Sequence, residues 1–101
     1  MIPIPTEPDT PKRPVRVLHL EDSAADHALA RLTLRRAGLP HEMRHVDTLD
    51  EFARWLQQEN FDLILADYRL PGFTALDAWR IAEQRPDHPP FVLLSGAIGD
   101  R

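Results

Sequence analysis

The fold of this chain is decided by one stretch near its middle, Phe61-Asp62-Leu63-Ile64-Leu65-Ala66-Asp67-Tyr68-Arg69-Leu70-Pro71-Gly72. The apolar run 63–66 is typical of a short strand buried on both faces, and Pro71-Gly72 prevents that strand from continuing. Asp67 therefore lies at the carboxyl end of an interior strand. In open parallel sheets, ligands bind in the crevice outside such strand ends, so Asp67 is a candidate reactive group. The alternative is an ordinary aspartate that starts a turn.

Length and composition restrict the classes of protein that remain. The 101 residues suit one domain, and the content of 43% hydrophobic and 28% charged residues is that of a globular chain. A net charge of -4 argues against general affinity for nucleic acid, and no apolar run approaches the roughly 20 residues of a membrane span. The sequence has no cysteine, which fits a reducing cytoplasm. We therefore expect a cytoplasmic domain that binds neither nucleic acid nor membrane.

The first third of the chain predicts a tail, a strand and a helix. Residues 1–14 are rich in proline, so we expect an extended, mobile tail, followed by one domain over residues 15–101. Residues 15–20 predict a strand. Ser23 is placed to cap a helix that ends at Gly38. The apolar stripe expected for this amphipathic helix consists of Ala25, Ala28, Leu29 and Leu32.

The remaining residues continue the alternation of strands and helices. A weaker strand over 41–46 precedes a helix capped by Thr48, and the central strand precedes a helix capped by Thr74. Three prolines then lead into a last short apolar strand, 91–96. The apolar stripes of these two helices are Leu49, Phe52, Ala53 and Leu56, and Ala75, Ala78, Trp79 and Ala82. This alternation predicts an α/β fold with an open parallel sheet of about four strands and three helices.

Polar side chains lie at or near the carboxyl ends of three of the predicted strands. Glu21 and Asp22 follow the first strand, Asp67 ends the third, and Ser95 lies in the fourth. Because parallel strands end at the same edge of a sheet, we expect these residues to lie within reach of one another. Two carboxylates ~4 Å apart repel by roughly 4 kcal/mol at an effective dielectric constant of about 20, so the cluster needs a cation or a proton. Oxygen ligands favour Mg²⁺ or Mn²⁺ over zinc.

A divalent ion beside a carboxylate provides the means for phosphoryl transfer onto that carboxylate. Asp67 would be the nucleophile, and the Ser95 hydroxyl would donate a hydrogen bond to the phosphoryl group. The alternative is that Glu21 and Asp22 merely begin the first helix, where acidic residues are favoured by the helix dipole. The expected meeting of all three acids at one edge of the sheet favours a cation-binding phosphoryl-transfer site over this alternative. The five histidines show no zinc spacing, and we assign them surface or core roles.

These motifs together resemble the receiver domain of two-component response regulators. The resemblance rests on Leu18-His19-Leu20-Glu21-Asp22-Ser23, then residues 65–72, then Val92-Leu93-Leu94-Ser95-Gly96-Ala97. It implies a flavodoxin-like fold with the sheet order 2-1-3-4-5 known for that family. It further implies that Asp67 accepts phosphate from a phosphohistidine on a sensor histidine kinase or a phosphotransfer protein. Mg²⁺ would be held by Glu21, Asp22, Asp67 and the backbone carbonyl of Arg69, and Ser95 would be the switch hydroxyl.

The sequence departs from the receiver pattern after the fourth strand. Receivers that resemble it continue into a fifth strand with a lysine at the phosphoryl group, whereas the only lysine here is Lys12. We therefore expect a truncated receiver with an open strand edge and an uncovered sheet face. We expect the chain to self-associate through this edge, through this face, or by exchanging elements between protomers. Two alternatives stay open. One is a binding and dimerisation module that no longer signals by phosphorylation, and the other is a magnesium phosphohydrolase, for which Arg69 stands where a second aspartate is usual.

Overall fold

Four parallel strands form the central sheet of the computed structural model, which describes residues 13–70 and 72–94. The strands are β1 (Val15–Leu20), β2 (His41–Val46), β3 (Leu63–Asp67) and β6 (Phe91–Leu94). They lie in the order β2-β1-β3-β6, with every neighbouring pair parallel. The predicted α/β class and parallel sheet are confirmed, and the order is the one that the resemblance implied for the first four strands.

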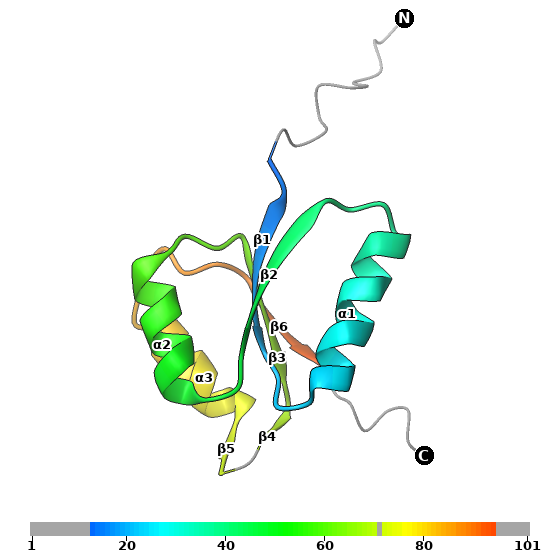
Figure 1. Ribbon diagram of the computed structural model, residues 1–101. Coiled ribbons are helices and arrows are strands. Elements are labelled where there is room, and N and C mark those ends of the chain that lie inside the picture. The colour runs from blue at the N-terminus through cyan, green and yellow to red at the C-terminus, as the bar shows by residue number, and fades with distance from the viewer. Residues whose placement is uncertain (1–12, 71, 95–101) are drawn as a thin grey trace, which may run out of the picture.

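The register of the ladder aligns the carboxyl ends of the strands. Leu20 pairs with Val46 on one side and with Ala66 on the other, and Asp67 pairs with Leu94. The residues that follow β1 and β3 therefore lie next to each other at one edge of the sheet, at the bottom of Figure 1.

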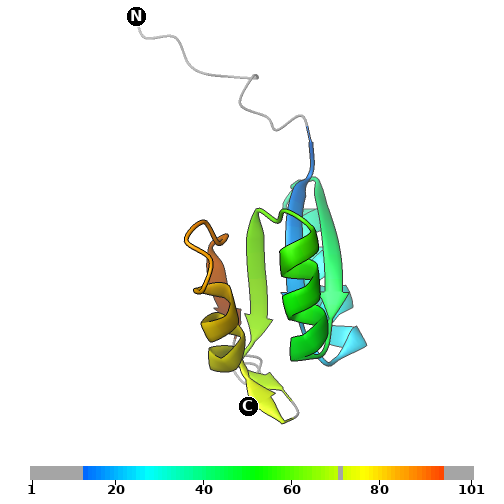
Figure 2. The same ribbon diagram turned by 90° about the vertical axis from the view of Figure 1, so that its left-hand side faces the viewer.

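In the described part of the chain, three helices cover the sheet from two sides. They are α1 (Ala24–Arg36), α2 (Leu49–Gln58) and α3 (Ala75–Ala82). Figure 1 shows α2 and α3 on one face and α1 on the other. In Figure 2, α1 lies behind the β1–β2 half of the sheet, and no helix of the described residues lies behind β3 and β6.

The hydrophobic core lies between the sheet and the α2–α3 layer. The predicted stripes supply it, because Phe52 and Leu56 of α2 and the alanines of α3 are buried against Leu18, Leu20 and Ile64. The small alanines let α3 approach the sheet closely. The predicted caps are present as well, since the Thr48 hydroxyl accepts from the Glu51 N–H at 3.1 Å and the Asp77 carboxylate accepts from the Thr74 N–H at 3.0 Å.

The predicted buried stripe of α1 is wrong, although the helix itself is confirmed. No residue of α1 is fully buried, and Leu29 and Leu32 of the expected stripe are 60% and 39% exposed. The partly buried residues are instead His27, Ala30 and Leu34, which recur at intervals of three and four on another side of the helix. The helical periodicity of the sequence predicts the helix correctly, but the side of α1 that packs against the sheet is the one that contains His27.

The central strand also differs from its prediction. Ile64 and Ala66 are completely buried, whereas Leu63 and Leu65 are only half-buried because they face the side covered by α1 alone. After β3 the chain forms a short antiparallel pair, β4 (Arg69–Leu70) and β5 (Phe73–Thr74), which we did not predict. Gly72 between them has a φ of 80°, which favours glycine at this position.

Several sequence predictions fall outside the described residues. These are most of the tail 1–14, Pro71, and everything from Ser95 to Arg101. Among the residues that the structure does describe, no helix is long and apolar enough to cross a membrane.

Candidate functional site

Three carboxylates converge at the carboxyl edge of the sheet. Glu21 and Asp22 follow β1, and Asp67 is the last residue of β3, one position beyond the Leu20–Ala66 pair. One oxygen from each of these side chains lies within 4.8 Å of the other two. The structure thus brings together the three acids that the sequence placed at this edge. Their role as metal ligands stays a prediction.

The three acids differ in burial, and Glu21 is the most enclosed. Glu21 is only 4% exposed, Asp67 is half-buried, and Asp22 is exposed. Burial, followed by the nearby charge of Asp67, raises the pKa of Glu21 to about 7 from its ordinary value of 4.5. A hydrogen bond from the Ser23 N–H to Glu21 Oε2, at 3.3 Å, acts in the opposite direction. Glu21 thus changes its charge near neutral pH.

The donor set of this cluster fits a hard divalent cation. Two unit charges 4.8 Å apart repel by roughly 3.5 kcal/mol at an effective dielectric constant of about 20. A Mg²⁺ ion removes that repulsion, and its preference for oxygen at about 2.1 Å places opposite ligands about 4.2 Å apart. Neighbouring ligands of the same octahedron lie about 3.0 Å apart, so the three carboxylates would have to approach one another by up to about 2 Å to bind one ion.

The other two predicted site residues are less well defined. Arg69 begins β4, two residues after Asp67. Ser95 lies outside the described residues. The roles of the Arg69 carbonyl and the Ser95 hydroxyl stay predictions.

Directly behind Glu21 lies a group of histidines that sequence reasoning missed. His19 of β1, His27 of α1 and His45 of β2, which we call the histidine cluster, fill the space between α1 and the sheet. The Nδ1 atoms of His19 and His27 are 2.9 Å apart, and the rings of His27 and His45 are stacked with centroids 4.2 Å apart. His19 is completely buried, and burial lowers its pKa to about 4, so it is neutral at pH 7.

One signal in the sequence could have found part of this cluster. His19 and His45 are each the fifth residue of a predicted strand, and they are direct partners in the β1–β2 ladder. Aligning the two strands from their first residues places them side by side. The position of His27 could not have been found in this way, because the apolar stripe of α1 indicated a different face.

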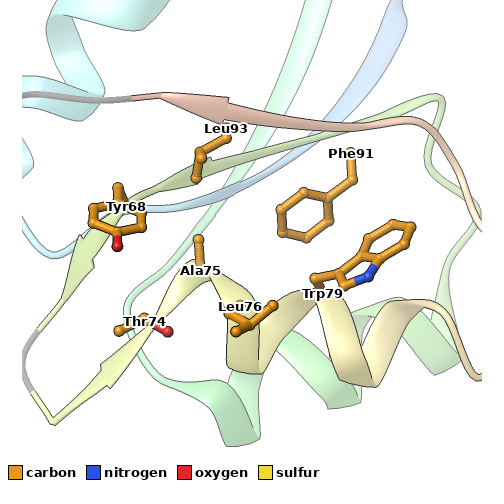
Figure 3. Close-up of a pocket in the computed structure, with 7 residues that line it drawn as sticks. All are labelled: Tyr68, Thr74, Ala75, Leu76, Trp79, Phe91 and Leu93. Atoms are coloured by element: carbon orange, nitrogen blue, oxygen red, sulfur yellow. The ribbon is translucent and has the colours of Figure 1, made fainter.

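A second feature of the structure is an apolar pocket between α3 and the edge strand β6. Its volume is about 560 Å³, and Figure 3 shows Phe91, Leu93 and Tyr68 around it, with Trp79 and Leu76 on the helix side. The Trp79 and Phe91 rings meet edge to face with centroids 5.5 Å apart. Leu93 is 52% exposed, so among the described residues apolar surface continues from the pocket to the β6 edge of the sheet.

Comparison with known proteins gives matches among solved structures. No protein-family model matches the sequence, and no curated protein matches it significantly. A response regulator from Hahella chejuensis is 30% identical, with a TM-score of 0.73, and the match covers 85% of this chain and 67% of that chain. The receiver domain of a sensor histidine kinase from Pseudomonas aeruginosa, with a magnesium ion in its active-site cleft, is 22% identical, with a TM-score of 0.68 and coverages of 86% and 72%. The response regulator TrrA from Thermotoga maritima, in complex with Mg²⁺-BeF, is 23% identical, with a TM-score of 0.68 and coverages of 80% and 69%.

The fold and the acids at the carboxyl edge of the sheet define the class of protein. A parallel sheet ordered β2-β1-β3-β6, with helices on both faces and acids at the carboxyl ends of β1 and β3, is a flavodoxin-like α/β domain with its site at the strand ends. The identity and coverage of the Hahella structure make the assignment more specific. The chain belongs to the receiver domains of response regulators.

Proposed function

We propose that this chain is a phosphoacceptor module of a two-component phosphorelay in which Asp67 receives the phosphoryl group. The donor would be a phosphohistidine on a sensor histidine kinase or a phosphotransfer protein. The observation that carries the proposal is the convergence of the Glu21, Asp22 and Asp67 carboxylates within 4.8 Å at the carboxyl edge of the sheet. Magnesium complexes of two receiver-type structures with the same fold support the choice of cation.

The proposed transfer forms one bond and breaks one. A carboxylate oxygen of Asp67 attacks phosphorus, the bond from phosphorus to the donor's imidazole nitrogen breaks, and the imidazole leaves with the electron pair and takes up a proton. Mg²⁺ bound to Glu21, Asp22, Asp67 and the Arg69 carbonyl would neutralise charge on the phosphoryl oxygens. Asp67 is half-buried at the end of β3, so part of its side chain stays accessible to a donor. The Ser95 hydroxyl would then contact the attached group.

The proposal describes a signalling module and not a turnover enzyme. Receiver domains in general act in this way, because the acceptor aspartate is itself modified. We also propose a cytoplasmic location, which the absence of cysteine from the sequence fits. A surface with a net charge of -4 gives no reason to propose nucleic acid as a partner.

A second candidate function is association between copies of the chain without a phosphorylation switch. It is favoured by the apolar surface of β6, where Val92 and Leu93 are 40% and 52% exposed at the edge of the sheet. We propose a homodimer that forms through the β6 edge or through the sheet face beside α1.

Phosphorylation by a small donor tests the leading proposal. The chain is incubated with Mg²⁺ and acetyl phosphate or phosphoramidate, and its intact mass is measured. We expect one added HPO₃ group that requires Mg²⁺ and is absent in Asp67→Asn. Asp50→Asn, which changes an exposed aspartate in the first turn of α2, is the matched control and should be modified like the unchanged chain. An unmodified chain, or an adduct that persists in Asp67→Asn, contradicts the assignment.

A further inference from the structure

The histidine cluster touches Glu21 at two separate points, and this contact suggests a role beyond packing. We propose that His19 and His45 are positioning residues that hold Glu21 in the orientation needed to bind the divalent cation, with His27 fixing the ring of His19. This inference rests on the proposed function, because it assigns support to a ligand of the proposed cation site. It concerns three residues to which the phosphotransfer chemistry gives no part.

The first contact holds the main chain of Glu21. His45 Nε2 lies 2.6 Å from the Glu21 carbonyl oxygen, and a carbonyl oxygen can only accept a hydrogen bond. His45 Nε2 therefore carries the proton and donates. The Glu21 N–H is held as well, since it donates to the Val46 carbonyl at 2.9 Å. Both backbone groups of Glu21 are thus tied to β2.

The second contact faces the side chain of Glu21. His19 Nε2 lies 3.8 Å from Glu21 Oε1, and the two side chains are 0% and 5% exposed. This nitrogen has no hydrogen-bond partner among the described residues. A completely buried, unpartnered ring nitrogen next to a ligand carboxylate is the position of an outer-shell donor whose bond shortens by a small movement of the carboxylate.

The contact between His19 and His27 determines which nitrogen carries the proton. Their Nδ1 atoms are 2.9 Å apart, so one donates and the other accepts. If His27 donates, neutral His19 carries its own proton on Nε2 and directs it at Glu21. The reverse arrangement places a lone pair of His19 against a ligand carboxylate, which is repulsive. His27 is in turn held by stacking on His45, with an interplanar angle of 9°.

The histidine cluster therefore restrains Glu21 from the side of α1 and β2, and Asp22 and Asp67 are the other two acids of the proposed cation site. Glu21 Oε2 accepts from the Ser23 N–H at 3.3 Å, and Oε1 faces His19. An apolar residue at position 19 could fill the same volume, but it has no proton to direct at Oε1. This difference separates a positioning role from a packing role and can be measured.

The test compares cation affinity with stability in variants of position 19. Affinity is measured by electron paramagnetic resonance of Mn²⁺, with Mg²⁺ as competitor, and stability of the metal-free chain by urea unfolding. We expect His19→Leu to bind Mn²⁺ about tenfold more weakly, the lower end of the usual effect of removing an outer-shell partner. Its stability should change little, because the removal of a buried unpartnered nitrogen opposes the loss of the partner of His27 Nδ1. His19→Gln, whose amide N–H reaches the position of Nε2, should recover most of the affinity.

Two further variants make the result decisive. His41→Leu changes a histidine at the opposite end of β2 and should leave the affinity unchanged. If His19→Leu does not fold, His27→Leu removes the donor to His19 from a half-buried position and should weaken binding in the same way. The positioning role alone is overturned if His19→Leu binds Mn²⁺ within twofold of the unchanged chain, or if His19→Leu and His19→Gln lose the same amount of Mn²⁺ affinity. Absence of any Mn²⁺ binding in the unchanged chain overturns the proposed function together with it.

Discussion

Cation binding by this chain should depend steeply on pH in the neutral range, because Glu21 titrates there. Burial and the charge of Asp67 raise the pKa of Glu21 to about 7, and a divalent cation binds its carboxylate and not its acid form. With that pKa, about 90% of Glu21 is ionised at pH 8 and about 10% at pH 6. The apparent affinity for Mg²⁺ should therefore fall about tenfold between these two values, whereas an ordinary glutamate would leave it almost unchanged.

The measurement is a Mn²⁺ titration followed by electron paramagnetic resonance at constant ionic strength, in steps from pH 6 to pH 8. Glu21→Gln is the control, because it removes the titrating group and should bind weakly without the pH slope. His19 does not confound the result, since its pKa of about 4 keeps it neutral throughout this range. An affinity that varies less than twofold, or a slope that persists in Glu21→Gln, would refute the reasoning.

Three further outcomes follow from the packing and the charges. In the metal-free chain the raised pKa of Glu21 makes the free energy of unfolding fall as pH rises from 4.5 to about 7, by at most about 3 kcal/mol. The lowered pKa of His19 has the opposite effect and makes the free energy of unfolding rise between pH values of about 4 and 6.5. Urea unfolding of His19→Leu should therefore reveal a decline with pH that the unchanged chain largely hides. Phe52→Ala empties the centre of the core, where Phe52 is 0% exposed, and should lower the free energy of unfolding by about 3–5 kcal/mol in urea titrations; a loss under 1 kcal/mol would show that the α2 interface is not the core. Leu93→Lys places a charge on the exposed β6 edge and should shift sedimentation toward the monomer, whereas a chain that is monomeric at high micromolar concentration without the change contradicts the proposed association.

The parts of the fold that could be predicted are those that local rules determine. The strands over 15–20 and 63–67 follow from apolar runs that end at charged or turn residues, and Thr48 and Thr74 mark the starts of α2 and α3. The meeting of Glu21, Asp22 and Asp67 was also predictable, because parallel strands place their carboxyl ends at one edge whatever the side chains do.

The parts that could not be predicted depend on how elements are rotated against each other. The apolar residues of α1 outnumber its histidine, so periodicity favoured the stripe that contains Leu29 over the side that contains His27. The face that meets the sheet contains His27, which contacts both His19 and His45, and these contacts are visible only in coordinates. The β4–β5 pair was missed because two residues per strand leave no periodic signal.

The burial of Glu21 links the core of the domain to its chemistry. A carboxylate in this position weakens the metal-free fold, because it is removed from water and lies near Asp67. A cation that neutralises the cluster removes this penalty, so binding and folding are thermodynamically coupled: saturating Mg²⁺ should stabilise the chain more at pH 8 than at pH 6. Glu21 and the histidine cluster therefore determine how strongly cation binding stabilises the fold.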